Sequence, residues 1–305
     1  MKPTMYDNFN LLEKRVIDTL TKSDLERIKE VLQRIKSPTI CTGVGGSNVV
    51  SNFASKVISR KNTCIVESIE PRSILYKDLT NYDNILACSY SGRNYGVSTS
   101  FNNDKVKYLL SSIPKEGVNN ITYASSIQKE DSFISLAATL MPMSILLAYY
   151  TDNDLSVIRE ILSTKKDYLV NISKIYEVLS GYDTSTASLF LESTLVESGI
   201  AIPIIHDKYG YCHGRSTTSY HQDSSAVIFN KGTELDKYLM SLLSSYYNQV
   251  ISIDSKYKDP IIDDFYFTYQ SMLLAKSIAS TANKDLSRVE YSPLVKKLYH
   301  YKGEM

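Results

Sequence analysis

The 305-residue chain carries 34 Lys and Arg against 33 Asp and Glu, which leaves a formal net charge of +1 at pH 7. This balance argues against a nucleic-acid-binding protein, because such proteins depend on an excess of basic charge. The four cysteines form no CxxC pair, and the most apolar stretch, residues 135–150, is too short to cross a bilayer. We therefore expect a globular, cytoplasmic protein with reduced thiols and no membrane partner.

The first part of the chain alternates helices and short strands. Residues 6–36 predict two helices with polar faces, because leucines and valines recur there at helical spacing. Short β-prone runs follow, and helical periodicity resumes after the first of them. This alternation indicates right-handed crossovers and a parallel sheet. The predicted strands are 39–42, 63–66, 85–88 and 120–123.

The second part repeats this layout after a mostly helical stretch, residues 133–180. Within that stretch, residues 176–179 could form a strand or remain helical. We expect two similar α/β halves, residues 1–150 and 151–305. The further predicted helices are 185–198, 233–247 and 259–282, and the further predicted strands are 202–205, 226–229 and 250–253.

A glycine-rich turn, Gly43-Val44-Gly45-Gly46-Ser47, follows the first predicted strand. Backbone N–H groups in such a turn, together with the N-terminus of the next helix, favour an anion. A dinucleotide site is an alternative, because Glu67 ends the second predicted strand, as the acidic ribose ligand does in nicotinamide-binding folds. Asn48 stands at the position of the third glycine, which disfavours that alternative. A tight turn without a ligand also stays open.

A serine-rich turn, Ser89-Tyr90-Ser91-Gly92-Arg93-Asn94, follows the third predicted strand. Its two hydroxyls and its amide can donate several hydrogen bonds to one phosphate. The carboxyl ends of parallel strands meet at one edge of a sheet, where ligands bind, so the glycine and serine turns are expected to share one site. The alternative is a turn that only caps the next helix.

A polar loop, Tyr211-Cys212-His213-Gly214-Arg215-Ser216, follows the predicted strand at 202–205. His213 and a carboxylate of the preceding helix, Glu192 or Glu197, can serve as acid and base on one carbon framework. An ordinary surface histidine is the alternative. We predict no metal site, because the spacing of the candidate ligands fits no compact zinc pattern. Those ligands are His206, Cys212, His213, His221 and Asp223.

Three of these segments together resemble the sugar isomerase (SIS) domain family of phosphosugar-binding proteins. They are the glycine turn, the serine turn and the Cys212-His213-Gly214 loop. The serine turn is similar to the SxSGxT phosphate loop of the family, and the third segment looks like the HG motif of fructose-6-phosphate aminotransferase-type isomerases. The spacing of Glu197 and His213 also resembles the Glu/His pair of archaeal-type phosphoglucose/phosphomannose isomerases.

The resemblance implies a tandem SIS fold: two three-layer α/β/α sandwiches with parallel sheets and a sugar phosphate in the cleft, usually in a homodimer. It implies an aldose–ketose isomerase, or a related deaminase, that works through an enediolate without a cofactor. Glu197 would move the proton between C2 and C1, and His213, from the neighbouring subunit in many relatives, would assist ring opening. The residues implied to bind phosphate and substrate are Gly45, Gly46, Ser47, Ser89, Ser91, Gly92, Arg93, Asn94 and Arg215.

Several positions depart from the family pattern. Asn94 replaces a Thr, Arg93 occupies a position that is often acidic or polar, and Arg215 stands where aminotransferase-type members have Pro. Glu192 competes with Glu197 as the base. A non-catalytic phosphosugar sensor that keeps the phosphate loop is therefore the alternative to an enzyme. A nicotinamide-dependent oxidoreductase is disfavoured by Asn48 and by the serine turn.

Overall fold

The computed structural model describes residues 2–219 and 224–294, which form two wholly parallel sheets and the helices that cover them. The first sheet has the strand order β2-β1-β3-β4-β5. In its register, Thr39 pairs with Val66 on one side and with Asn84 on the other. Its strands are β1 (Thr39–Thr42), β2 (Val66–Ile69), β3 (Asn84–Cys88), β4 (Val106–Ser111) and β5 (Asn119–Thr122).

The second sheet has the order β7-β6-β8-β9 and is again parallel throughout. The α/β class and the parallel sheets expected from the sequence are confirmed. The run at 176–179, for which helix was also considered, belongs to a strand. The strands are β6 (Ile175–Ser180), β7 (Ile202–Asp207), β8 (Ser224–Asn230) and β9 (Gln249–Asp254).

Helices around the first sheet begin with three that precede β1, where the sequence predicted two. α4 follows the glycine turn and packs on β1 and β2, while α6 and α7 follow β5 along the chain. These helices are α1 (Met5–Asn10), α2 (Leu12–Lys22), α3 (Leu25–Leu32), α4 (Gly46–Asn62), η1 (Pro71–Leu75), α5 (Tyr95–Ser100), α6 (Ala137–Tyr150) and α7 (Ser156–Ser163).

Helices around the second sheet repeat this arrangement, since α8 follows β6 as α4 follows β1. The long α12 then returns to the middle of the molecule. These elements are η2 (Tyr182–Thr184), α8 (Ser185–Glu197), α9 (Lys208–Gly210), η3 (Tyr211–Arg215), α10 (Ser216–Ser219), α11 (Glu234–Tyr246) and α12 (Pro260–Thr281).

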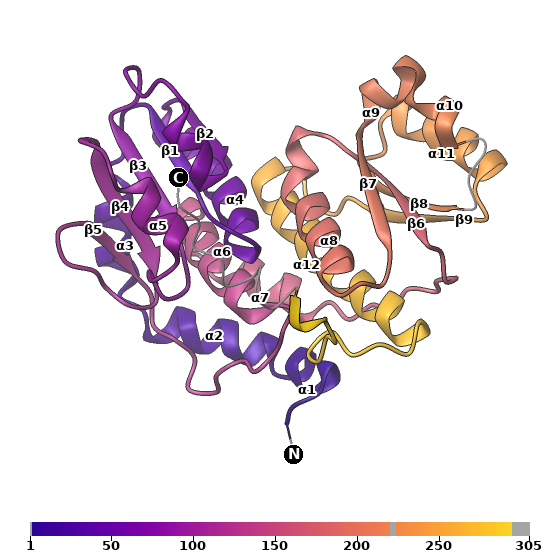
Figure 1. Cartoon of the computed structure of the whole chain (residues 1–305), viewed down its shortest axis with the longest axis horizontal. Helices are drawn as coiled ribbons and strands as arrows, with labels where there is room; N and C mark the ends of the chain where they lie inside the picture. Colours follow the sequence, from indigo (N-terminus) through magenta and orange to yellow (C-terminus); the bar gives the residue numbers. More distant parts are fainter. Residues whose placement is uncertain (1, 220–223, 295–305) are drawn as a thin grey trace.

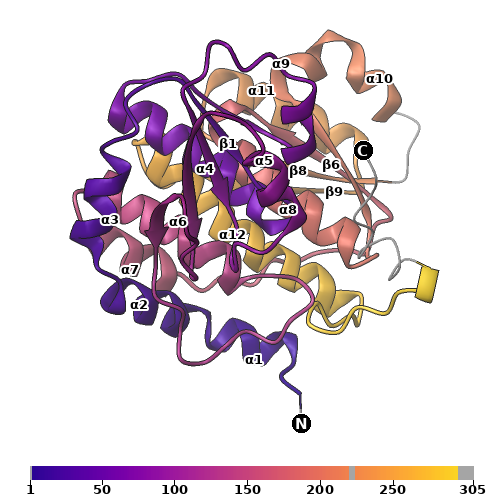
Figure 2. The same cartoon turned by 60° about the vertical axis from the view of Figure 1, so that its left-hand side comes forward.

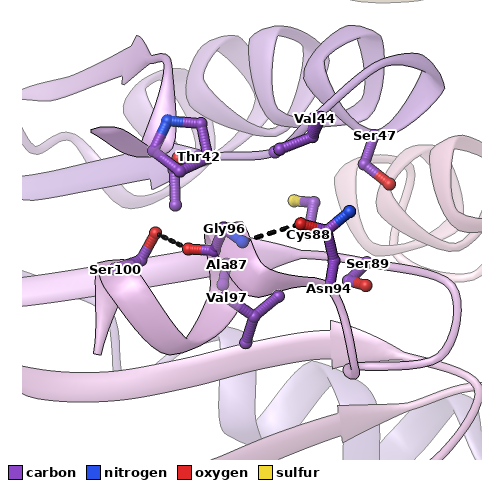
Figure 3. Close-up of a pocket in the computed structure, with 12 residues that line it drawn as sticks. Thr42, Val44, Ser47, Ala87, Cys88, Ser89, Asn94, Gly96, Val97 and Ser100 are labelled. Carbon is purple, nitrogen blue, oxygen red and sulfur yellow. Dashed lines mark hydrogen bonds between the residues drawn. The ribbon is translucent and has the colours of Figure 1, made fainter. Parts of the chain in front are cut away.

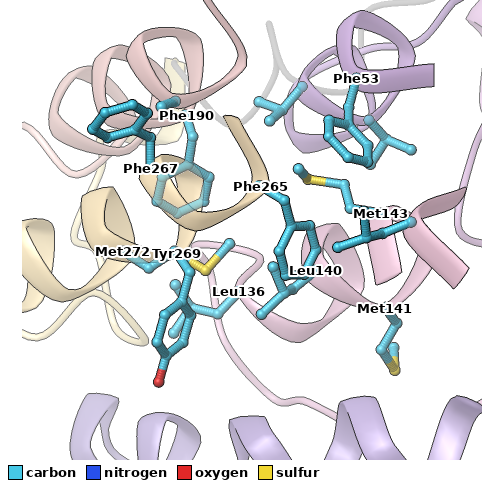
Figure 4. Close-up of a cluster of buried hydrophobic side chains, with 14 of the residues drawn as sticks. Phe53, Leu136, Leu140, Met141, Met143, Phe190, Phe265, Phe267, Tyr269 and Met272 are labelled. Atoms are coloured by element: carbon cyan, nitrogen blue, oxygen red, sulfur yellow. The ribbon is translucent and has the colours of Figure 1, made fainter. Parts of the chain in front are cut away.

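The hydrophobic core lies between the two sheets, where α4, α6, α8 and α12 pack against one another (Figures 1 and 2). Phe53 of α4 stacks at a tilt on Phe265 of α12, and Met143 and Phe190 fill the same layer (Figure 4). α6 and α12 are apolar on nearly all sides, because neighbours surround them. Among the described helices, none is long and apolar enough to span a membrane.

One strand prediction was wrong, and one strand was not predicted. The segment 63–66 does not begin a strand, because α4 continues to Asn62 and Thr63 ends it in the left-handed conformation, with φ 57°. The strand starts only at Val66. β4 was missed altogether, although its last four residues are buried beside β3. Lys107 and Tyr108 interrupt the apolar run there, which hides the strand in the sequence.

Candidate functional site

A crevice opens at the carboxyl ends of β1 and β3. The chain leaves β1 toward β2 on one side and leaves β3 toward β4 on the other, so the loops diverge. Such a reversal of strand order is where parallel α/β sheets bind ligands. A cavity of about 20 Å³ lies at this point (Figure 3). Its lining residues are Thr42, Gly43, Val44, Ser47, Pro71, Ala87, Cys88, Ser89, Asn94, Gly96, Val97 and Ser100.

The glycine turn forms one wall of this cavity and starts α4. Gly45 has φ 57° and ψ −130°, a conformation that essentially only glycine adopts. A Cβ on Gly46 would lie 2.7 Å from Thr139 Oγ1, so the start of α4 is pressed against α6. Within the described part of the chain, no side chain caps the N-terminus of α4. Its backbone N–H groups are therefore suited to an anion.

The serine turn forms the opposite wall. Ser89 Oγ accepts from the N–H of Gly92 at 3.2 Å, and Ser91 Oγ accepts from the N–H of Arg93 at 3.4 Å. Asn94 Oδ1 accepts from the Gly96 N–H at 2.7 Å and so caps α5. This is the cap that the alternative interpretation of the serine turn predicted. These bonds use acceptor capacity and leave the hydroxyl protons and the Asn94 amide protons able to donate.

The predicted phosphate residues are thus only partly gathered. Ser47, Ser89 and Asn94 line the cavity at the sheet edge, whereas Ser91, Gly92 and Arg93 lie in the same turn but outside that lining. Arg93 is exposed. The sequence did not indicate Thr42, which ends β1, lines the cavity and is 1% exposed. Its hydroxyl has no hydrogen-bond partner within residues 2–219 and 224–294. The position of Thr42 at the end of a predicted strand is the sequence feature that could have identified it.

Glu197 reaches this region from the second half of the chain. It ends α8, and its Oε1 lies 3.9 Å from the position that a Cβ on Gly45 would occupy. Ser193 Oγ donates to the same oxygen at 2.6 Å. A cavity of about 30 Å³ lies beneath this carboxylate. It is lined by Gly46, Val49, Ile134, Ser135, Phe190, Ser193, Thr194 and Glu197.

Glu192 lies just over one turn before Glu197 on the same helix and is half-buried. Burial raises the pKa of Glu192, and the negative charge of Glu197 raises it further. Glu197 lines the cavity next to the glycine turn, whereas Glu192 does not. Ser135 and Thr139 also approach this turn, but they come from the start of α6 and carried no sequence signal.

His213 and Arg215 lie elsewhere in the same chain. Both are exposed in η3, which follows the edge strand β7, and Gly214 between them has φ 104°. Figure 1 shows the neighbouring α9 and α10 at the outer end of the second half, well apart from β3 and α5. Tyr211 anchors the segment, because it is fully buried and meets the ring of His206 edge-on at 5.3 Å.

The geometry gives little support to the two alternative sites, the dinucleotide site and the metal site. Glu67, the candidate ribose ligand, is paired with Lys77 at 2.6 Å. His206 is buried against Glu177, while Cys212 and His213 are exposed, so these candidate metal ligands point to different surroundings. His221 and Asp223 lie outside the described residues. Within residues 2–219 and 224–294, no three His, Cys, Asp or Glu side chains gather as a metal site would require.

Comparison with known proteins decides the fold. No family model and no curated protein matches this sequence. Among solved structures, the C-terminal domain of glucosamine-fructose-6-phosphate aminotransferase from Francisella tularensis superposes with a TM-score of 0.71 at 15% identity, covering 94% of this chain and 98% of that one. The chain has the SIS-type fold of phosphosugar isomerases.

Two further structures of this fold span the same length. Tagatose-6-phosphate ketose/aldose isomerase from Escherichia coli has a TM-score of 0.73 at 13% identity, covering 94% of this chain and 95% of that one. Glucosamine-6-phosphate deaminase from Thermotoga maritima has a TM-score of 0.71 at 12% identity, with coverage of 94% and 95%. At these identities the likeness establishes the arrangement of elements.

Proposed function

We propose that this chain is a tandem SIS protein that binds a sugar phosphate and moves a proton between its adjacent carbons. The observation that carries the proposal is the meeting of Ser47, Ser89 and the Glu197 carboxylate around one glycine turn. The phosphate lies at the carboxyl ends of β1 and β3, held by hydroxyls, the Asn94 amide and the start of α4. Arg93, exposed at the rim, adds a cation.

The chemistry of the proposed reaction needs only a base and an acid. Glu197 takes the C2 proton of the open-chain aldose, the C2–H electron pair forms the C1–C2 double bond, and O1 receives a proton from the O2 hydroxyl. Return of the proton to C1, with a carbonyl at C2, gives the ketose. No oxidant or other reactant is consumed. A related deaminase, the alternative that the sequence resemblance implies, would use the same base at the same carbon.

We further propose a cytoplasmic homodimer, in which His213 and Arg215 complete the site of the neighbouring subunit. Two observations support this proposal: both side chains are exposed, and the neighbouring α9 and α10 lie at the outer end of the second half, well apart from β3 and α5 (Figure 1). The separation of His213 from Glu197 within one chain also favours a second candidate function, that of a sensor. If no partner supplies His213, the phosphate cavity would remain in a protein that senses a phosphosugar without converting it.

The test is loss of deuterium from C2-labelled sugar phosphates. We expect wild-type protein to exchange the label and Glu197→Gln to exchange it at least a hundredfold more slowly, in line with a general base. Binding of the same sugars, followed by thermal shift, should persist in Glu197→Gln. Unchanged exchange in Glu197→Gln contradicts the assignment of the base. Binding without any exchange in the wild type establishes the sensor.

A further inference from the structure

Ser135 lines two cavities at once. One is the small cavity beneath Glu197, and the other has a volume of about 250 Å³. Tyr90, which stands between the two serines of the serine turn, lines the larger cavity as well. The large cavity therefore adjoins both the proposed phosphate turn and the proposed base. Its other lining residues are Arg15, Ser126, Gln128, Lys129, Glu130, Ser132, Ala137, Ala138 and Met141.

Two charged side chains, the buried Arg15 and the half-buried Glu130, form part of the wall of this cavity. The Arg15 side chain, 2% exposed, donates from Nε to the Gln128 carbonyl at 2.9 Å and from Nη2 to the Lys129 carbonyl at 3.2 Å. The Glu130 carboxylate accepts the N–H groups of residues 136, 137 and 138, each at 3.0 Å. Segment 128–138 is therefore fixed by charge-assisted bonds before any ligand arrives.

The same bonds determine which ligand suits the cavity. Arg15 and Glu130 attract each other and have protein partners, and Lys129, the other charged residue of the lining, is exposed to solvent. The less exposed part of the wall therefore has no uncompensated charge to offer an ion. Ser126 also lines the cavity, is 6% exposed, and its hydroxyl has no hydrogen-bond partner among the residues that the structure describes. A buried polar group of this kind calls for a partner. The cavity therefore suits a neutral group that forms hydrogen bonds.

This cavity is much larger than the two beside the glycine turn, which have volumes of about 20 and 30 Å³. At roughly 30 Å³ per water, the cavity has space for about eight water molecules. We propose that it is a subsite for an uncharged, amide-bearing substituent on the reacting end of a sugar phosphate. The substrate would then be an N-acylated amino sugar phosphate or a similar derivative. This inference rests on the proposed function, because the phosphate and the base fix where the substituent points.

Calorimetric titration with three probes tests this subsite. We expect N-acetylglucosamine 6-phosphate to bind about tenfold more tightly than glucose 6-phosphate or the cationic glucosamine 6-phosphate. Ser126→Leu fills the cavity and should remove this preference while leaving glucose 6-phosphate binding unchanged. Ser244→Leu, on the exposed face of α11, is the matched control and should keep the preference. Ala138→Leu fills the cavity from α6 and replaces Ser126→Leu if that variant does not fold.

The outcomes separate this inference from the proposed function. If wild-type protein binds N-acetylglucosamine 6-phosphate and glucose 6-phosphate with equal affinity, the subsite is overturned, while the phosphosugar site stays intact. A loss of affinity for both sugars in Ser126→Leu, with normal folding, also overturns it. If none of the three sugar phosphates binds, the proposed function itself fails and the subsite fails with it.

Discussion

Glu192 shows how the fold changes the titration of one residue next to the candidate base. Burial and the Glu197 charge raise the pKa of Glu192 above that of an unfolded chain. A carboxyl group whose pKa is higher in the folded state stabilises the fold at low pH, and this contribution to the free energy of unfolding is lost as the pH rises through the folded pKa. At neutral pH the charged Glu192 therefore destabilises the fold.

We accordingly expect Glu192→Gln to raise the melting temperature by about 2 °C at pH 7. At pH 4, where Glu192 is largely protonated in both states, the substitution should have no effect. Calorimetric melting at the two pH values measures this difference. An equal gain at both would show that packing, not charge, is responsible.

A second prediction at the scale of one residue concerns Gly45. Its positive φ recurs at Gly232, where a Cβ would meet no atom within 4 Å. Alanine at either position should cost about 1–2 kcal/mol of folding free energy through backbone strain. Only Gly45→Ala should also weaken sugar phosphate binding, because Gly45 starts α4 beside Glu197. Denaturant titration and thermal shift with glucose 6-phosphate measure the two effects.

Single residues also explain how much of the site could be read from the sequence. The turns that contain Gly45, Ser47, Ser89 and Asn94 were predictable, because local turn chemistry directly after a strand identifies them. The part of these residues in binding stays a prediction. Ser135 and Thr139 reach the same turn only through the packing of α6 against α4, which no local pattern records. The roles of Glu197 and His213 rest on a family resemblance, and they stay predictions.

At the scale of elements, α6 depends on a cap from outside the helix. Glu130 accepts the N–H groups at its start, and we expect Glu130→Ala to cost about 3 kcal/mol because these buried donors lose their acceptor. The neighbouring Asp131→Ala removes only an exposed pair with Arg288 and should cost far less stability, because solvent screens such a pair. Urea unfolding of both variants provides the comparison, and equal losses would contradict the capping role.

Some helices and strands could be predicted from the sequence more accurately than others. α4 and β3 were predictable, because uninterrupted periodicity or a continuous apolar run marks each one. The second strand was placed three residues early, since Thr63, Cys64 and Ile65 have strand propensity but serve to end α4. Such boundaries depend on where the preceding helix stops, which packing on the sheet decides.

At the scale of the whole molecule, a buried ion pair joins the two halves. Lys56 Nζ of α4 lies 2.6 Å from Asp264 Oδ2 of α12, and Thr186 of α8 donates to the same oxygen. Both charged side chains are almost fully buried. Removing one partner leaves a buried charge uncompensated.

We expect Lys56→Met to cost about 3–5 kcal/mol of stability. The double variant Lys56→Met/Asp264→Leu should recover most of that loss, because no charge stays buried without a partner. Equilibrium unfolding in urea measures the single variants and the double variant. A double variant as unstable as the sum of the two singles would show that the pair does not act as a unit.

The placement of α6 and α12 between the sheets has a consequence for a chain cut in two. The link between α7 and β6, residues 164–174, has no regular secondary structure, so a break there interrupts no helix or strand. The first fragment would carry α6 and the second α12, and each of these apolar helices would lose the part of its cover that the other fragment supplies. Prepared separately, neither piece should fold by itself, whereas mixing them should restore one native particle, as in a split reporter.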